Sequence, residues 1–278
     1  AVLGDAGLAS YRAAVRRRWT EDPADPQVRA AAERLARLDR DVDTLVAVVG
    51  GDLRHAAQYG RLARALHEID ADDDALVWAE RGLRAHPADP PGVGLRDFLV
   101  EAYLRRGGRA DAVRLRREGL RAAPGMAAYV ALRKAAQEAG RWPQERAAAL
   151  SVLRDRNPAD HVRALLYEED DAEAAWSAAA RTRASLGGAV WDDLARRRAA
   201  ERPAEALPVL RRRVEEVLQA SGREAYRDAA RRLVELRDIS RRVGQGAQFE
   251  AYLRELTDRY RRRPSLLAEL TSAGLVAA

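Results

Sequence analysis

The sequence predicts an all-α protein, a right-handed α-solenoid in which helix-turn-helix repeats stack along the chain. Apolar residues recur at helical spacing over most of its 278 residues, and no segment convincingly suggests a strand. In addition, residues 59–87 are nearly repeated 37 residues later, over residues 96–124. The offset aligns Leu62 with Leu99, Leu66 with Tyr103, Ala75 with Ala112, Gly82 with Gly119 and Pro87 with Pro124. A fixed offset through two helical segments and their turns is typical of stacked repeats.

The first 55 residues predict three helices. Leu8, Tyr11, Val15 and Trp19 form one apolar stripe over residues 5–19. The pair Asp25-Pro26 predicts an N-cap and first-turn proline for the next helix. Residues 42–49 are apolar enough for a strand, but helical neighbours on both sides favour a short helix.

The repeats follow in residues 56–186. The first copy should begin with a helix over 56–69, and the acidic turn at 70–74 should cap its second helix. We favour helix capping and dipole complementation for Asp72, Asp73 and Asp74 over metal binding. A third, weaker copy starts at Tyr129, and a shorter pair follows with start signals at 157–158 and 170–171.

The last part, residues 187–278, predicts further helices that complete one continuous array. Pro203 begins one helix, and the segment 221–224 (SGRE) reads as a capping box for a long helix ending near Arg242. A break at 244–246 and Pro264 delimit the last two helices.

Composition limits the function classes. No apolar run approaches the ~20 residues of a membrane helix, so we expect a cytoplasmic protein without membrane contact. The absence of cysteine excludes disulfides, thiol catalysis and cysteine-ligated metals. The net charge is +6, and the basic excess lies after residue 195, where 19 basic residues face 12 acidic ones.

Within each copy, the pattern matches the tetratricopeptide (TPR) repeat. In the first copy, Tyr59 takes the aromatic position, Leu66 the large apolar position and Ala75 the small one, and Pro87 ends the unit. Small residues let paired helices approach closely, and a large residue fills the remaining gap. The period is slightly longer than the ~34 residues of these repeats because of the linker at 87–94.

Longer phrases carry a more particular resemblance. In order along nearly the whole chain, these include GLASYRAAVRRRW, VWAERGLRAHP, FLVEAYLRRGGRADAVRLR, RPAEALPVLRRRVEEVLQ and FEAYLRELTDRYRRRPSLLAEL. They resemble the C-terminal helical region of actinobacterial SWIM zinc-finger proteins. That family carries a cysteine- and histidine-ligated zinc module upstream, thought to bind DNA or protein. We expect either that such a module precedes this chain or that the chain is a divergent stand-alone region.

Catalytic signatures are not found, and neither an enzymatic activity nor a cofactor nor a metal is expected. The sequence has no phosphate-binding loop, its only lysine is Lys134, and its four histidines lack metal-site spacing. The five tryptophans fall on or beside apolar stripes, which favours packing between helices over base stacking.

Two function hypotheses remain, and the first is a protein- or peptide-interaction scaffold with an unidentified partner. Solenoids bind extended partners in a groove lined by the first helix of each repeat. The repeat register predicts that this groove contains Arg61, Arg64, His67, Asp97, Glu101, Arg105 and Lys134. These side chains could equally form a solvated face.

The alternative is a nucleic-acid-associated module that uses the arginine-rich C-terminal helices. Arginine clusters lie at 211–213, 231–232, 241–242 and 261–263. They would give salt-sensitive affinity for phosphates without reading bases. Glutamates at helical spacing from these clusters offer the competing interpretation of paired, solvated helix faces.

Overall fold

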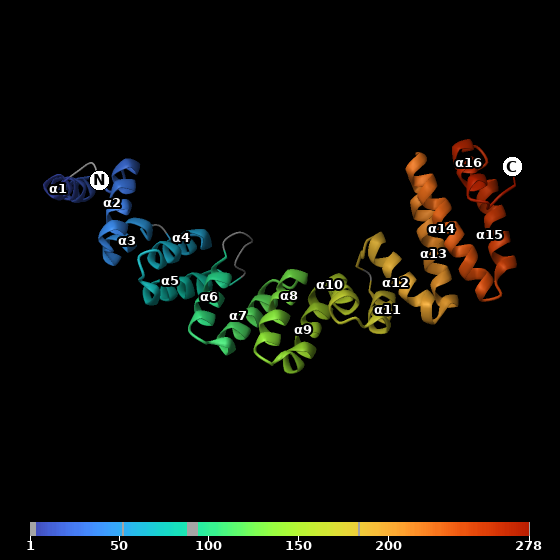
Figure 1. Ribbon diagram of the computed structural model, residues 1–278, viewed down its shortest axis with the longest axis horizontal. Helices are drawn as coiled ribbons and strands as arrows, with labels where there is room; N and C mark the ends of the chain where they lie inside the picture. Colours follow the sequence, from blue (N-terminus) through green and yellow to red (C-terminus); the bar gives the residue numbers. More distant parts are fainter. Residues whose placement is uncertain (1–3, 52, 88–93, 183, 278) are drawn as a thin grey trace. The chain divides into compact units, whose positions relative to one another are not determined.

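The structure is a computed structural model that describes residues 4–51, 53–87, 94–182 and 184–277. These residues are almost entirely helical and contain no strand, which confirms the predicted all-α class (Figure 1). The chain divides into two compact units, Ala1–Val152 and Leu153–Ala278, and the division falls within one helix.

In the first unit, consecutive helices pack against each other along the chain. They are α1 Asp5–Glu21, α2 Pro26–Asp39, α3 Val42–Val49, α4 Ala56–His67, α5 Asp72–Ala85, α6 Leu95–Arg105, α7 Arg109–Ala122, α8 Met126–Glu138 and the first part of α9, Trp142–Arg156. Residues 42–49 are helical, as favoured above. The neighbour-to-neighbour packing is that of a helical-repeat array.

The turns inside the repeats share one geometry. Asp70, Gly107 and Gly140 follow α4, α6 and α8, and all three have a left-handed backbone, with φ of 62°, 76° and 66°. In each turn, the next residue's N–H donates to a carbonyl in the preceding helix, over 2.7–3.0 Å. This is the helix-ending motif that left-handed residues permit. The turn therefore repeats even where aspartate replaces glycine.

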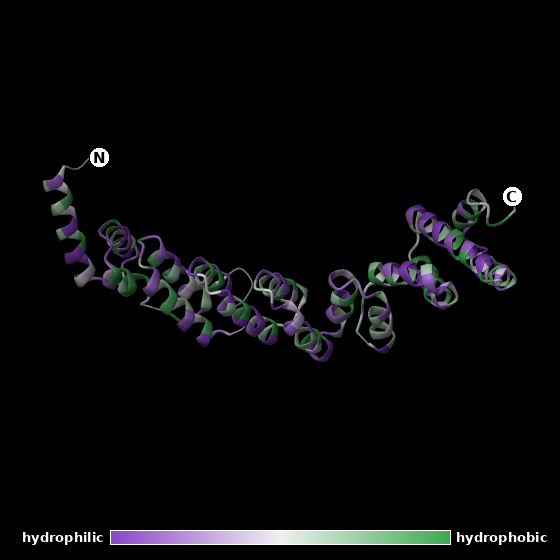
Figure 2. Cartoon of the chain, turned by 60° about the horizontal axis from the view of Figure 1, so that its bottom comes forward, coloured by the Kyte–Doolittle hydropathy of each residue, from purple (hydrophilic) through white to green (hydrophobic). Residues whose placement is uncertain are grey.

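The repeated positions also form the core of the first unit. Leu62, Leu99 and Leu132 are at most 1% exposed, and Ala75 and Ala112 are equally buried. Figure 2 shows hydrophobic and hydrophilic residues alternating along the helices, as expected for helices that bury one stripe. The positions that recur along the repeats in the sequence are thus the positions that the structure buries.

The second unit contains the end of α9, then α10 Pro158–Arg163, a π-helical turn Ala164–Glu168, α11 Ala172–Arg181, α12 Gly188–Glu201, α13 Pro203–Gln219, α14 Arg223–Arg242, α15 Gly246–Arg259 and α16 Pro264–Ser272. One hydrophobic cluster joins α12 through α16, and it includes Phe249 and Leu233, which are at most 1% exposed. Asn157 and Asp171 cap α10 and α11 through their side chains, as predicted.

Two capping predictions are wrong. The segment 221–224 is not a capping box, because α14 begins at Arg223 after Gly222 and no side chain caps it. The acidic turn before α5 does not cap that helix either, since Ala71 occupies the N-cap position. Asp72, Asp73 and Asp74 lie in the first turn, where their charges complement the helix dipole.

Candidate functional site

The predicted groove residues lie on α4, α6 and α8, the first helices of the three repeats. Two of them form ion pairs with neighbouring helices. Arg61 of α4 pairs with Glu33 of α2, and Asp97 of α6 pairs with Arg116 of α7. These two side chains therefore connect neighbouring helices of the array in addition to facing solvent.

His67 lies at the centre of a small polar cluster. Its Nδ1 atom lies 2.5 Å from Asp72 Oδ1, and its ring meets the ring of Phe98 edge-on, with centroids 5.9 Å apart. The hydrogen bond with His67 lowers the pKa of Asp72, and the charge of Arg105 contributes in the same direction. The structure thus pairs His67 with Asp72, which was not among the predicted groove residues.

The remaining predicted residues are exposed. Arg64, Arg105, Glu101 and Lys134 all face solvent. Within the described ranges of the chain, Glu101 and Lys134 form no ion pair, so their charges remain available to a partner. They lie on α6 and α8, the first helices of the second and third repeats.

A cavity that sequence analysis missed lies between α5, α6 and α7. It has a volume of about 430 Å³. Leu83, Leu99 and Leu115 form its apolar floor and are at most 8% exposed. Its other lining residues are Glu80, Arg84, Pro87, Arg96, Tyr103, Arg114, Glu118 and Ala122. No spacing rule points to it, because it depends on how three helices meet.

One lining residue, Arg96, is a buried charge at a repeated position. It stands where the first copy has Tyr59, and each side chain lies against the equivalent glycine, Gly119 or Gly82. The Arg96 guanidinium donates to the carbonyl oxygens of Leu115 at 2.9 Å and Pro87 at 2.6 Å. The offset of 37 aligned these residues, but it could not show that arginine is buried in the tyrosine position.

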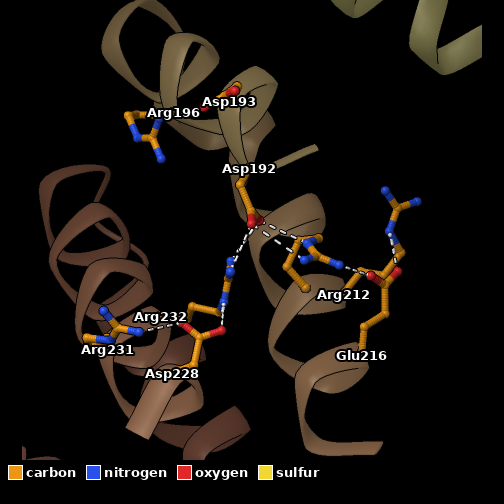
Figure 3. A network of polar contacts seen from close by, with 9 residues as sticks. Asp192, Asp193, Arg196, Arg212, Glu216, Asp228, Arg231 and Arg232 are labelled. Atoms are coloured by element: carbon orange, nitrogen blue, oxygen red, sulfur yellow. Dashed lines mark hydrogen bonds and ion pairs between the residues drawn. The ribbon is translucent and has the colours of Figure 1, made fainter. Parts of the chain in front are cut away.

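In the second unit, the arginine-rich helices contain an extensive network of ion pairs (Figure 3). The Asp192 carboxylate on α12 accepts hydrogen bonds from Arg213 on α13, at 2.9 Å, and from Arg232 on α14, at 2.7 and 2.8 Å. Burial alone would raise the pKa of Asp192, but the hydrogen bonds from Arg232 and Arg213 outweigh it and lower the pKa. One carboxylate therefore joins three helices.

Several other arginines of the basic clusters lie over aromatic rings. Arg212 lies 4.3 Å from the centroid of Trp191, Arg211 lies 5.2 Å from that of Tyr252, and Arg263 lies 4.8 Å from that of Tyr260. Arg231 pairs with Asp228. Much of the basic excess thus makes contacts within this unit. Of the glutamates at helical spacing, Glu216 pairs with Arg212 and Arg213, whereas Arg242, Arg261 and Arg262 are exposed.

The tryptophans are half-buried and pack within their units. Trp176 and Trp191 meet edge-on with centroids 6.5 Å apart, and Trp142 meets Tyr129 in the same way at 5.6 Å. Arg81 lies over the ring of Trp78. These contacts agree with the packing role favoured from the sequence.

The described ranges contain neither a metal-binding cluster nor a membrane-spanning helix. No group of three or more histidine, aspartate or glutamate residues there could hold a metal ion. Among the helices of the same ranges, none combines the length and apolar character needed to cross a membrane.

Comparisons with known proteins give little further information. No protein-family model matches the chain, and no curated protein matches it. Among solved structures, a chain in the crystal structure of the APC/C hetero-tetramer Cut9–Hcn1 is similar, with 11% sequence identity over 94% of this chain and a TM-score of 0.29. The alignment covers 51% of that chain, about half its length. A TM-score this low carries no argument, so the fold assignment rests on the helices themselves.

Proposed function

We propose that this chain is a non-catalytic scaffold of TPR-like repeats that binds a protein or peptide partner. The observation that carries the proposal is the repeated helix pair, with the same buried positions and the same left-handed turn in successive copies. Such arrays present an extended surface on rigid helices, which suits binding of extended partners.

The partner surface we propose comprises the exposed residues of the first helices. Glu101 and Lys134 carry charges without an ion pair in the described part of the chain, and Arg105 is exposed on α6. Charges of both signs favour a partner with its own mixed charges, because complementary potentials give specificity.

Affinity purification of the tagged chain from a bacterium that encodes it, with cross-linking and mass spectrometry, tests the proposal. We expect a reproducible protein partner. We also expect the combined variant Glu101→Arg, Arg105→Glu, Lys134→Glu to lose this partner. Arg109→Glu, on α7, is the matched control, because it changes the net charge by the same amount at an exposed site. If no partner is recovered, or if the combined variant retains it as well as the control does, the proposed surface is wrong.

We also propose that the chain belongs to the SWIM zinc-finger proteins as their C-terminal helical region, on the strength of the ordered helical phrases. Sequencing the gene upstream of the first codon of this chain tests this proposal. A continuous reading frame with a CxC…CxH segment would support it, and a stop codon without such a segment would contradict it.

A further inference from the structure

The cavity between α5, α6 and α7 has the features of a second binding site. It involves none of the proposed groove residues, and its floor of three leucines is apolar. Its volume of about 430 Å³ falls in the range of about 300–1,000 Å³ usual for binding pockets. Water in such a cavity finds few hydrogen-bond partners at the floor, so an apolar group gains free energy by displacing it.

The rim of the cavity carries one ion pair on each bank. On α5, Arg84 lies 3.5 Å from Glu80, and on α7, Arg114 lies 3.3 Å from Glu118. Both are exposed pairs within a single helix, which contribute little to stability. No ion pair joins the two banks among the described residues. Glu80 also accepts a hydrogen bond from Tyr103 of α6, and Arg114 also pairs with Asp111 at 3.2 Å, so an occupant competes with these contacts for the rim charges.

A rim of this kind complements a peptide backbone. The two glutamates can accept hydrogen bonds from amide N–H groups, and the two arginines can donate to carbonyl oxygens. Together with the buried Arg96, the lining holds three arginines and two glutamates. The excess positive charge favours an occupant with acidic residues beside its apolar side chain over one with basic residues.

We propose that this cavity binds an extended segment of a partner protein that inserts one large apolar side chain, flanked by acidic residues. The inference rests on the proposed scaffold function and adds to it a separate site on the α5–α7 side of the repeats. It also gives Arg96 a second role, since Arg96 lines the cavity while its guanidinium bonds to backbone carbonyls.

Selection of random short peptides displayed on phage against the intact chain tests this inference. We expect enriched peptides to share one large apolar residue with acidic neighbours. The half-buried Ala122 lines the cavity at the end of α7, so Ala122→Trp should fill it. The enriched peptides, made synthetically with a fluorescent label, should bind this variant at least about tenfold more weakly, because the apolar side chain loses its pocket.

A second variant keeps the test decisive if Ala122→Trp disturbs folding. Arg84→Glu changes the lining from an excess of one arginine to an excess of one glutamate, and Arg84 is an exposed residue. A repeated selection on this variant should replace acidic flanks by basic ones, a reversal that mere destabilisation cannot produce. Arg109→Glu, outside the lining on α7, should leave both affinity and flank preference unchanged.

The outcomes separate this inference from the proposed function. If a native partner is recovered and binds Ala122→Trp and the original chain equally, the cavity is not its site and the inference is overturned while the scaffold function stands. Selected peptides without an apolar residue, or peptides whose binding is lost only in the combined variant of Glu101, Arg105 and Lys134, would likewise overturn it. Failure to recover any protein partner would count against the scaffold function itself.

Discussion

Replacing Asp192 by asparagine should loosen the second unit around α12, α13 and α14. The carboxylate bonds to Arg213 and Arg232, and the side chains of all three residues are at most 20% exposed. Asparagine keeps the size of the side chain but removes its charge and offers only one acceptor oxygen. Two poorly solvated guanidinium groups would then face a neutral amide.

The expected cost follows from the geometry. Breaking a buried ion pair costs about 3–5 kcal/mol, and the partial exposure of these groups places the expected cost at about 2–3 kcal/mol. That free energy corresponds to an increase of about 30- to 140-fold in the local opening equilibrium.

Hydrogen exchange measured by mass spectrometry on the full chain is the suitable assay, because helical arrays open locally and global melting blurs such changes. Peptides from α12, α13 and α14 should exchange faster, and peptides from the first unit should not. The neighbouring change Asp193→Asn is the control, since Asp193 bonds to Arg196 and Tyr167 at a more exposed position. Equal effects of the two changes would refute the assigned role of Asp192.

The stabilising contribution of Asp192 should also depend on pH. Because the pKa of Asp192 is lowered on folding, its stabilising contribution is present above the unfolded value near 3.8 and is lost as the pH falls through the folded pKa. The difference in exchange between Asp192→Asn and the original chain should therefore be full at neutral pH and shrink in strongly acidic solution. A difference that stays constant down to low pH would contradict the charge-based explanation.

Three further changes test other parts of the structure. Gly82→Ala would place a Cβ atom 2.5 Å from Tyr59 Cβ, so thermal unfolding should show the first unit destabilised by about 1–3 kcal/mol. Gly246→Ala is the control and should have little effect, because the nearest atom to its Cβ would lie at 3.7 Å. Arg96→Ala removes two hydrogen bonds from a charged donor, so the free energy of unfolding measured in urea should fall by about 2–4 kcal/mol. A decrease below about 0.5 kcal/mol would mean that water replaces these hydrogen bonds. Burial and the hydrogen bond to Asp193 raise the pKa of Tyr167 to about 12. The difference between the ultraviolet titration curves of the original chain and of Tyr167→Phe should therefore show a tyrosine that titrates late. Asp193→Asn should lower the pKa of Tyr167 toward 10.

Much of the fold could be predicted from local patterns in the sequence. Apolar spacing and proline positions located the helices, and the offset of 37 located the buried positions Leu62, Leu99, Ala75 and Ala112. These signals are local because a helix is specified by residues three and four apart.

The parts that sequence missed depend on contacts between distant residues. The expected capping box at 221–224 failed because the pattern fits the motif but the backbone enters α14 one residue later. The cavity and the Asp192 network join residues on different helices, and their geometry follows from packing angles that no spacing encodes. Among the groove residues, the exposure of Glu101 and Lys134 could be predicted, but the pairing of Arg61 with Glu33 could not.

Gly82 and Gly119 show what a repeated unit must keep and what it can change. Each glycine leaves space for one long side chain of the preceding first helix, and that side chain is tyrosine against Gly82 but arginine against Gly119. The glycine thus sets the distance between the helices, but it does not determine which side chain packs between them. An array built on this rule can place either a charged or a neutral side chain between its helices by a single substitution, while its helix spacing stays constant.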